Sequence, residues 1–323
     1  MKILLVGGAG YIGAHVQLAF LDRGHQVGVY DNLSSGLREN IQEGVPFFEG
    51  DILDQQRLDE VCGQGWDGLV HLAAFKAAGE SMLEPEKYAV NNISGSINII
   101  SSCTQRGITN LVLSSSAAVY GEPEYLPVDE AHPTEPTNYY GFTKLEIERN
   151  LQWFHRLRGL NFAALRYFNA AGYDLQGRVS GLENNPANLI PVVMEAAVGR
   201  REALSIFGDD YPTPDGTGVR DYIHVNDLAE AHVSAMEFLQ HEKRPLIVNL
   251  GSETGLSVLE VLEAARRISG RSIPAKVSPR RPGDPAKLLA SSRKARELLG
   301  WQAKHSGVDQ LIESTWKVYW ELA

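Results

Sequence analysis

The fold is decided by the N-terminal stretch Met1-Lys2-Ile3-Leu4-Leu5-Val6-Gly7-Gly8-Ala9-Gly10-Tyr11-Ile12-Gly13. The apolar run 2–6 predicts a buried β-strand, and the periodicity of residues 12–22 predicts a helix directly after it. Gly7, Gly10 and Gly13 join the two with the spacing G-x-x-G-x-x-G, which permits a tight turn. The free amides at the N-terminus of such a helix bind a pyrophosphate. This stretch therefore predicts the first unit of a dinucleotide-binding sheet.

The rest of the first half repeats the pattern of a short apolar run followed by helical periodicity, which is typical of βαβ units and a parallel sheet. Further strands are expected at residues 26–30, 46–49, 68–71, 110–114 and 162–166. Further helices are expected at 54–62, 85–106 and 138–157. Six strands in this order predict an α/β protein with a Rossmann-type, doubly wound parallel sheet.

The sequence changes character near residue 170. Residues 172–188 are rich in Gly and Asn, and 208–218 are rich in Asp, Pro and Gly, as expected of surface loops that carry function. Helical patterns return at 225–242, 257–269, 291–299 and 307–321. We therefore predict a first domain at 1–171 and a smaller α/β domain at 172–323 that covers the carboxyl ends of the strands.

Composition narrows the range of partners. The net charge of -10 argues against a nucleic-acid backbone or an anionic membrane surface as the main partner, although a local anion site stays open. Cys62 and Cys103 form no Cys-x-x-Cys pair, which predicts no disulfide framework, no metal site and a reducing compartment. The N-terminus has no room for a signal peptide, and no stretch is as long as a membrane span. The expected location is the cytoplasm.

A second motif carries chemistry. Tyr140 lies four residues before Lys144, and this spacing places both side chains on one face of a helix. A lysine ammonium there would lower the pKa of the tyrosine from about 10 and make Tyr140 a general base for an alcohol. The serine run Ser114-Ser115-Ser116 precedes the motif, as it would in a redox enzyme.

Asp31 helps to select the cofactor. It ends the second predicted strand 18 residues after Gly13, close to the spacing of about 20 expected for the carboxylate that binds an adenosine ribose. A carboxylate there would repel the 2′-phosphate of NADP, so NAD is favoured, with Arg38 leaving NADP open. Asp51 and Ile52 follow the third strand, where they would bind an adenine edge or form a solvated turn.

Together these residues resemble the extended short-chain dehydrogenase/reductases and, within them, the UDP-glucose 4-epimerase branch. The similarity extends over essentially the whole chain. The general family carries the glycine loop, the serine and the Tyr-x-x-x-Lys motif. The branch adds the segments 71–76 (HLAAFK), 114–121 (SSSAAVYG), 166–169 (RYFN) and 207–225 (FGDDYPTPDGTGVRDYIHV).

The resemblance implies a function and a set of site residues. It implies epimerisation of UDP-glucose and UDP-galactose at carbon 4 through a transient 4-keto sugar, a homodimer, and a return of the chain to the first domain around 221–250. Catalysis would fall to Ser116, Tyr140 and Lys144. The resemblance assigns NAD contacts to Gly7, Gly10, Tyr11, Ile12, Gly13, Asp31, Asn32, Asp51, Ile52, Phe75, Lys76, Asn91, Ser114, Tyr140, Lys144 and Phe168. It assigns contacts with the UDP-sugar to Lys76, Ser116, Tyr140, Asn169, Asn188, Leu189, Ser205, Phe207, Arg220, Arg281, Asp284 and Leu288.

Related activities are weighed by single residues. Dehydratases of the family carry an Asp-Glu pair directly after the serine, where this chain has Ala117 and Ala118, neither of which can exchange a proton. Epimerases of N-acetylhexosamines, uronates or pentoses stay open as alternatives, and Leu288 would stand at the wall of the sugar pocket. A catalytically silent dinucleotide-binding regulator is disfavoured by the intact Ser116, Tyr140 and Lys144.

Overall fold

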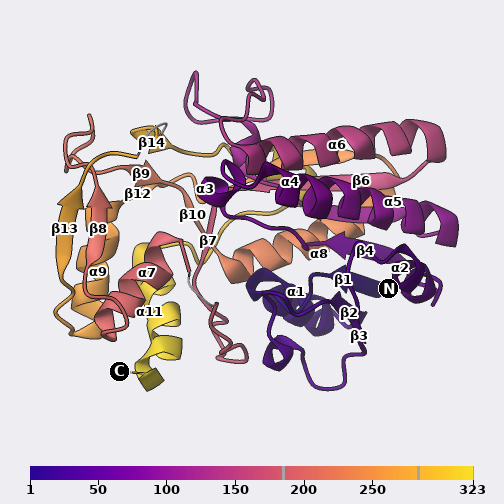
Figure 1. Cartoon of the computed structure of the whole chain (residues 1–323), viewed down its shortest axis with the longest axis horizontal. Coiled ribbons are helices and arrows are strands. Elements are labelled where there is room, and N and C mark those ends of the chain that lie inside the picture. Colours follow the sequence, from indigo (N-terminus) through magenta and orange to yellow (C-terminus); the bar gives the residue numbers. More distant parts are fainter. Residues whose placement is uncertain (184–185, 282–283, 323) are drawn as a thin grey trace.

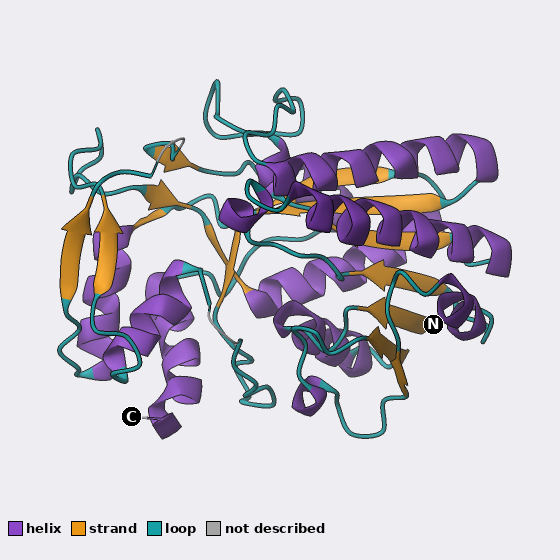
Figure 2. Cartoon of the chain, in the orientation of Figure 1, coloured by secondary structure: helices purple, strands orange, loops and turns teal. Residues whose placement is uncertain are grey.

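The computed structural model describes residues 1–183, 186–281 and 284–322. These residues form a larger lobe around a parallel sheet and a smaller lobe of helices and short strands (Figure 1; Figure 2 shows the same view by element type). The large sheet has the strand order β11-β6-β5-β4-β1-β2-β3, and every neighbouring pair is parallel. Its strands are β1 (Lys2–Val6), β2 (Gln26–Asp31), β3 (Phe47–Glu49), β4 (Gly68–His71), β5 (Asn110–Ser114), β6 (Asn161–Tyr167) and β11 (Leu246–Leu250).

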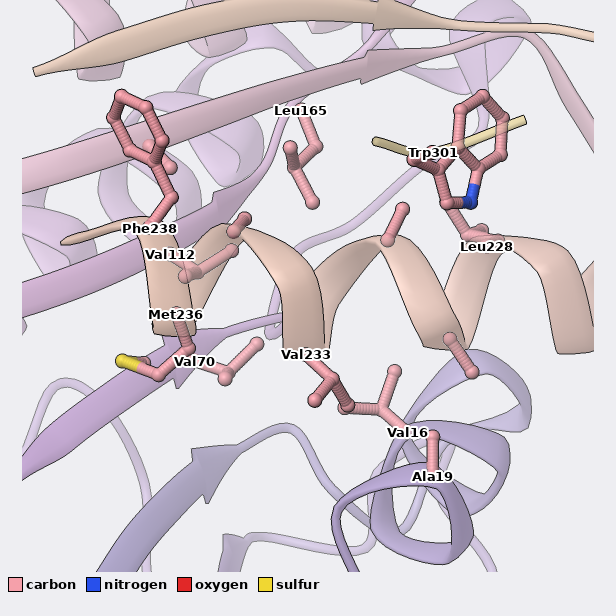
Figure 3. Packing of buried hydrophobic residues seen from close by; sticks show 14 of the residues in the cluster. Val16, Ala19, Val70, Val112, Leu165, Leu228, Val233, Met236, Phe238 and Trp301 are labelled. Atoms are coloured by element: carbon pink, nitrogen blue, oxygen red, sulfur yellow. The ribbon is translucent and has the colours of Figure 1, made fainter. Parts of the chain in front are cut away.

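Helices cover both faces of this sheet because its strands are apolar on both sides. On one face α1 (Tyr11–Asp22) and α8 (Val225–Glu242) pack Val16, Val233 and Met236 against sheet residues such as Val70 and Val112 (Figure 3). The other face is covered by α2 (Gln55–Cys62), α5 (Gly95–Arg106) and α6 (Tyr139–Arg158). The predicted Rossmann-type sheet is therefore confirmed.

Two features of the large lobe differ from the sequence prediction. The helix expected at 85–106 is divided into α4 (Pro85–Tyr88), a π-helical segment (Ala89–Ser94) and α5. Within the π-helical segment, the side chain of Asn92 contacts the backbone of Phe75 and the hydroxyl of Thr143, which explains a polar residue buried in this helix. The seventh strand, β11, was not predicted as a separate element, and it pairs with β6.

The smaller lobe consists of helices and short strands that the loops of the second half connect. Its strands pair as β8 (Leu204–Phe207) with β13 (Ala275–Ser278), and as β9 (Val219–Arg220) with both β12 (Leu256–Ser257) and β14 (Lys287–Leu288). Its helices α7 (Leu189–Ala197), α9 (Val258–Ser269) and α11 (Val308–Tyr319) share an apolar core that also includes Ala14 and Leu18 of α1. The two lobes are therefore joined by packing as well as by the chain.

The remaining elements are short. They are α3 (Ala78–Ser81), α10 (Arg293–Leu299), β7 (Asn169–Ala171), β10 (Tyr222–His224), and the 3₁₀ turns Arg38–Asn40, Ala117–Val119 and Trp320–Leu322. The α10 helix packs with α8 and β11 against the large sheet, although it lies late in the sequence. The division at residues 171 and 172 stays a prediction. In the described part of the chain, no helix is both apolar enough and long enough to span a membrane.

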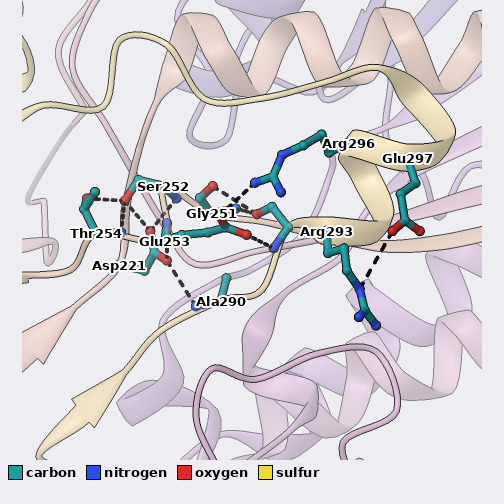
Figure 4. A network of polar contacts seen from close by, with 10 residues as sticks. Asp221, Gly251, Ser252, Glu253, Thr254, Ala290, Arg293, Arg296 and Glu297 are labelled. Carbon is teal, nitrogen blue, oxygen red and sulfur yellow. Dashed lines mark hydrogen bonds and ion pairs between the residues drawn. The ribbon is translucent and has the colours of Figure 1, made fainter.

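A buried carboxylate fastens the segments that cross between the lobes (Figure 4). Asp221 lies between β9 and β10 and is fully buried. Its side chain accepts hydrogen bonds from the amides of Ser252 (2.7 Å), Glu253 (3.2 Å) and Ala290 (3.1 Å). Its carbonyl oxygen accepts a further bond from Asn169 Nδ2 at 2.9 Å. Three segments far apart in the sequence are thus held around Asp221.

Candidate active site

The N-terminus of α6 presents Tyr140 and Lys144. Asn138 caps the helix by accepting a hydrogen bond from the amide of Gly141 at 2.9 Å, and the amide of Tyr140 donates to Ser81 Oγ at 3.0 Å. Lys144 Nζ donates to the carbonyl oxygen of Ser114 at 2.8 Å and lies 5.9 Å from the centre of the Tyr140 ring. The helix therefore brings the predicted base and the predicted lysine together at the carboxyl end of β5.

Ser116 joins this pair from the neighbouring loop. It caps the 3₁₀ turn Ala117–Val119 by accepting a hydrogen bond from the amide of Ala118 at 3.1 Å, and its side chain lowers the pKa of Tyr140. Gly141 makes the close approach of helix and loop feasible, because a Cβ atom there would lie only 2.3 Å from the carbonyl oxygen of Ala118. The structure thus assembles Ser116, Tyr140 and Lys144 into one cluster.

Burial decides the protonation of this cluster. Desolvation raises the pKa of Tyr140, and the hydrogen bond with Ser116 opposes that shift only in part. Desolvation also lowers the pKa of Lys144 to about 8, against the raising effect of Glu148. The expected lowering of the Tyr140 pKa by Lys144 is therefore wrong for this structure. The physical reason is that the ammonium is directed to the Ser114 carbonyl, while Tyr140 is removed from water.

The glycine loop forms a cradle that fits a dinucleotide. Gly7 has φ +84°, and a Cβ atom on it would lie 2.5 Å from the amide nitrogen of Ala73. Gly13 packs as tightly, with its hypothetical Cβ 2.5 Å from the carbonyl oxygen of Gly8. Gly10 caps α1 without any side-chain hydrogen bond, so the amides of the first turn face outward for a pyrophosphate. We conclude that these residues fit NAD.

Asp31 lies at the end of β2, beside this cradle. Its carboxylate accepts hydrogen bonds from the amides of Ala9 (3.0 Å) and Leu33 (2.9 Å). Burial raises the pKa of Asp31, and these amide bonds counteract that effect. Asp31 therefore has a second task that the sequence did not reveal, which is to hold the glycine loop in place.

The other predicted cofactor residues are distributed along the same edge of the sheet. Asn32 Nδ2 donates to Asp51 at 2.7 Å, and Ile52 is buried against Gly95. Asn92 holds the neighbouring loop in place, because its side chain bonds both the side chain of Asn91 and the backbone of Phe75. The remaining members have these positions: Tyr11 bonds the carbonyl of Gly172, Ile12 lies on α1, Lys76 pairs with Glu183, Ser114 Oγ bonds His232 at 2.8 Å, and Phe168 packs beside the 117–120 loop.

The predicted substrate residues lie mainly on the smaller lobe. Arg220 on β9 forms an ion pair with Asp284 (3.2 Å), and the guanidinium of Arg281 lies 3.9 Å from the centre of the Phe207 ring. Leu288 pairs with Arg220 in the register of β14 and β9, and it packs with Phe168 against the cluster of Ala117, Val119 and Tyr120. The others are placed as follows: Asn169 on β7, Asn188 and Leu189 at the start of α7, and Ser205 on β8.

The structure does not bring all these residues to one point. Strand β8, with Ser205 and Phe207, lies at the opposite end of the molecule from β2 and β3, which carry the predicted adenosine contacts (Figure 1). Leu288 lies between these extremes, close to the loop that carries Ser116. The predicted residues therefore follow an extended path from the glycine loop to the smaller lobe. In the ranges described, no group of three or more His, Cys, Asp or Glu side chains is arranged to hold a metal ion.

Sequence reasoning missed several residues that support the cluster. Ser81 accepts a hydrogen bond from the amide of Tyr140 in the first turn of α6, and Asn92 connects the Phe75 loop to α6. Glu148 is buried one turn beyond Lys144 and binds Arg166 and Ser115. A detectable signal existed for Glu148, because a carboxylate four residues after Lys144 shares its helix face. Ser81 and Asn92 gave no comparable signal, since their partners are distant in sequence.

Comparison with known proteins gives consistent matches along the chain. Residues 3–251 match the model of the NAD dependent epimerase/dehydratase family. The UDP-glucose 4-epimerase of Lacticaseibacillus casei is 45% identical over 317 residues, which cover 98% of this chain and 96% of that protein. The structure of UDP-glucose 4-epimerase from Brucella ovis in complex with NAD is 42% identical, with a TM-score of 0.95, and the match covers 97% of this chain and 96% of that one.

A third relative was solved with a sugar nucleotide. UDP-glucose-4-epimerase from Stenotrophomonas maltophila, with bound NAD and formylated UDP-arabinopyranose, is 38% identical, with a TM-score of 0.96. The match covers 100% of this chain and 98% of that one. The similarity thus includes the smaller lobe as well as the dinucleotide cradle.

Proposed function

Because this chain belongs to the NAD-dependent epimerase/dehydratase family, we propose that it interconverts UDP-glucose and UDP-galactose by inverting carbon 4 of the sugar, with NAD as its cofactor. One observation carries this proposal. The identity to UDP-glucose 4-epimerases extends over nearly the whole length of both proteins, including the lobe that carries the predicted substrate residues. The enzyme is therefore an isomerase that leaves the net oxidation state of its substrate unchanged.

The residues of the cluster have distinct roles in this reaction. When bound, NAD supplies the capacity to accept a hydride and to return it. Tyr140 removes the proton from the sugar hydroxyl at carbon 4 and restores it after inversion. Ser116 donates a hydrogen bond to the sugar oxygen on which charge develops. Lys144, one turn along the same helix face, would hold the nicotinamide ribose of the cofactor.

The smaller lobe supplies the grip on the nucleotide. Arg220 and Arg281 are suited to the diphosphate, because a guanidinium is planar and permanently charged. Inversion requires the keto sugar to turn its other face to the cofactor, so the UDP end must be held firmly while the sugar is held loosely. Ala117 and Ala118 offer no proton donor beside Ser116, which favours return of the keto sugar over loss of water.

Turnover of the purified protein with UDP-galactose tests this function. We expect UDP-glucose to form without any added reductant, in a coupled assay with a UDP-glucose dehydrogenase. The control is the Tyr140→Phe variant at the same protein concentration. Consumption of added NADH, or a dehydrated product detected by mass spectrometry, would assign the chain to a different activity of the family.

We further propose that two copies form a homodimer through the outer face of α5 and α6. These helices pack side by side and expose Ile97, Trp153 and Leu157, with Trp153 58% and Leu157 69% exposed. Large apolar side chains gathered on one face favour burial against a second copy. Light scattering should give a dimer for the native chain and a monomer for Leu157→Arg. The matched control is Val277→Arg, a change at an exposed apolar residue of β13.

Two less specific proposals complete the assignment. We propose the cytoplasm as the location, which fits two buried, unpaired cysteines, Cys62 and Cys103. We also keep the domain proposal of 1–171 and 172–323 with a return at 221–250, for which the pairing of β11 with β6 is supporting evidence. Cell fractionation and limited proteolysis would test the two proposals.

A further inference from the structure

A buried carboxylate, Glu148, lies on α6 one turn beyond Lys144. Glu148 is 1% exposed and occupies the same face of α6 as Tyr140 and Lys144, at intervals of four residues. Its Oε1 and Oε2 atoms accept hydrogen bonds from Arg166 Nε (3.0 Å) and Arg166 Nη2 (2.6 Å). Arg166 belongs to β6, so this two-point pair connects α6 to the sheet.

The third contact of Glu148 reaches the serine run. Ser115 Oγ donates to Glu148 Oε1 at 2.5 Å. The carbonyl of Ser114 accepts a hydrogen bond from Lys144 Nζ at 2.8 Å, and the side chain of Ser116 lowers the pKa of Tyr140. Two consecutive serines are thus hydrogen-bonded to two residues of one helix face, and Glu148 binds Ser115, the one directly before Ser116.

The network extends one further layer away from the site. Arg166 Nη1 donates to the hydroxyl of Tyr120 at 2.9 Å, and that hydroxyl donates to Asn249 Oδ1 on β11 at 2.6 Å. Each polar atom of this layer therefore meets a partner with good geometry, which is the condition under which a buried ion pair fixes one arrangement.

We propose that Glu148 is a positioning residue for the reaction, which holds the serine run against α6 and provides the counter-charge for Lys144. This inference rests on the proposed function for its catalytic consequence, but its contacts are those of the chain itself. Without Glu148, Ser115 would lose its acceptor and Arg166 would be left as an unpaired buried cation beside the cluster. Both changes would disturb the placement of Ser116 and the charge of Lys144.

Other groups face the same layer and have to be considered in any pH experiment. From the neighbouring elements these are His71 on β4, Tyr167 and Arg166 on β6, His232 on α8, and Tyr120 with Glu130 from the loop after β5. Burial lowers the pKa of His71 to about 3 and that of His232 to about 4, so both are neutral above pH 6. Glu148 is the carboxylate whose charge raises the pKa of Lys144 against the effect of burial.

The test uses Glu148→Gln, which keeps the shape and an acceptor for Ser115 but removes the charge. The first readout is trace acetylation of Lys144 as a function of pH, measured by peptide mass spectrometry, which needs no turnover. We expect the midpoint of the Lys144 titration to fall, because the Glu148 carboxylate one turn along the helix opposes the lowering effect of burial on the pKa of Lys144. In the same variant, the decline of turnover at high pH should begin at a lower pH, by the same shift as the Lys144 midpoint.

Two further variants separate positioning from simple loss of stability. Glu146→Gln removes a carboxylate of the same helix that pairs with exposed Arg149, and it should leave both readouts unchanged. The double variant Glu148→Gln with Arg166→Met removes the unpaired cation, and it should move the Lys144 midpoint part of the way back. A Glu148→Gln variant with an unmoved midpoint, whose turnover falls only in proportion to its folded fraction, would overturn the proposal. A shifted midpoint in a chain that does not epimerise UDP-galactose would refute the proposed function and leave the positioning role intact.

Discussion

Replacing Gly141 by alanine is expected to separate the two halves of the catalytic cluster. The new Cβ atom would lie 2.3 Å from the carbonyl oxygen and 2.9 Å from the carbonyl carbon of Ala118, both backbone atoms that no side-chain rotation can move. A contact of 3.4 Å is ordinary, so helix and turn have to move apart by about 1 Å. Ser116 moves with the turn, because its hydroxyl accepts the amide of Ala118.

The expected loss follows from this displacement. A misplacement of about 1 Å at a catalytic group costs about 10²-fold in rate, so kcat with saturating UDP-galactose should fall by about that factor. The affinity for UDP, measured by calorimetry, should stay near the native value because Arg220 lies on the other lobe. The control is Gly307→Ala, since a Cβ atom there meets open space.

The Gly141→Ala variant could also be more stable and fully active. Alanine is favoured over glycine inside a helix by about 1 kcal/mol, so a tolerant site would gain stability. A Gly141→Ala protein with native kcat and a raised melting temperature would show that the turn yields without moving Ser116. The close contact would then have no catalytic meaning.

Other changes test separate parts of the assignment. Tyr140→Phe should lower turnover by about 10² to 10⁴, the usual contribution of a positioned acid-base group, and near-normal turnover would remove Tyr140 from its role. Nucleotide released by acid from the purified protein should be NAD or NADH, whereas recovery of NADP would contradict the interpretation of Asp31. Leu288→Tyr should lower the catalytic efficiency for UDP-N-acetylhexosamines relative to UDP-hexoses, because it adds bulk next to the Ser116 loop; an unchanged ratio would mean that another wall sets the limit. Asp221→Ala should reduce the free energy of unfolding by about 3 kcal/mol in chemical denaturation, since it leaves buried amide donors without an acceptor, and an unchanged midpoint would contradict that account.

The large lobe was predictable because its signals are local. The strands at 2–6, 68–71 and 110–114 coincide with β1, β4 and β5, since each is a continuous apolar run bounded by polar residues or glycine. The smaller lobe was not predictable in the same way. Strands such as β9 and β14 have two residues each, and their pairing depends on contacts between segments about 70 residues apart.

In the candidate site, too, local features were predictable from the sequence and features that depend on burial or distant contacts were not. The spacing of Tyr140 and Lys144 predicted a shared helix face, and the structure places them on it. The same spacing gave the wrong direction for the pKa of Tyr140, because sequence distance carries no information about desolvation. Ser81, likewise, reaches Tyr140 from 59 residues away, and no pattern in the chain announces that contact.

The pairing of β11 with β6 has a consequence for synthesis. Until residues 246–250 have emerged from the ribosome, β6 is an unpaired edge, and the residues that later complete the sheet arrive after β7 to β10 have been made. An exposed edge strand of this kind invites pairing with other chains. A nascent chain that stalls between residues 170 and 245 would therefore carry most of a cofactor-binding sheet with β6 as an exposed edge strand that is prone to aggregation. Pairing of β11 with β6 covers this edge.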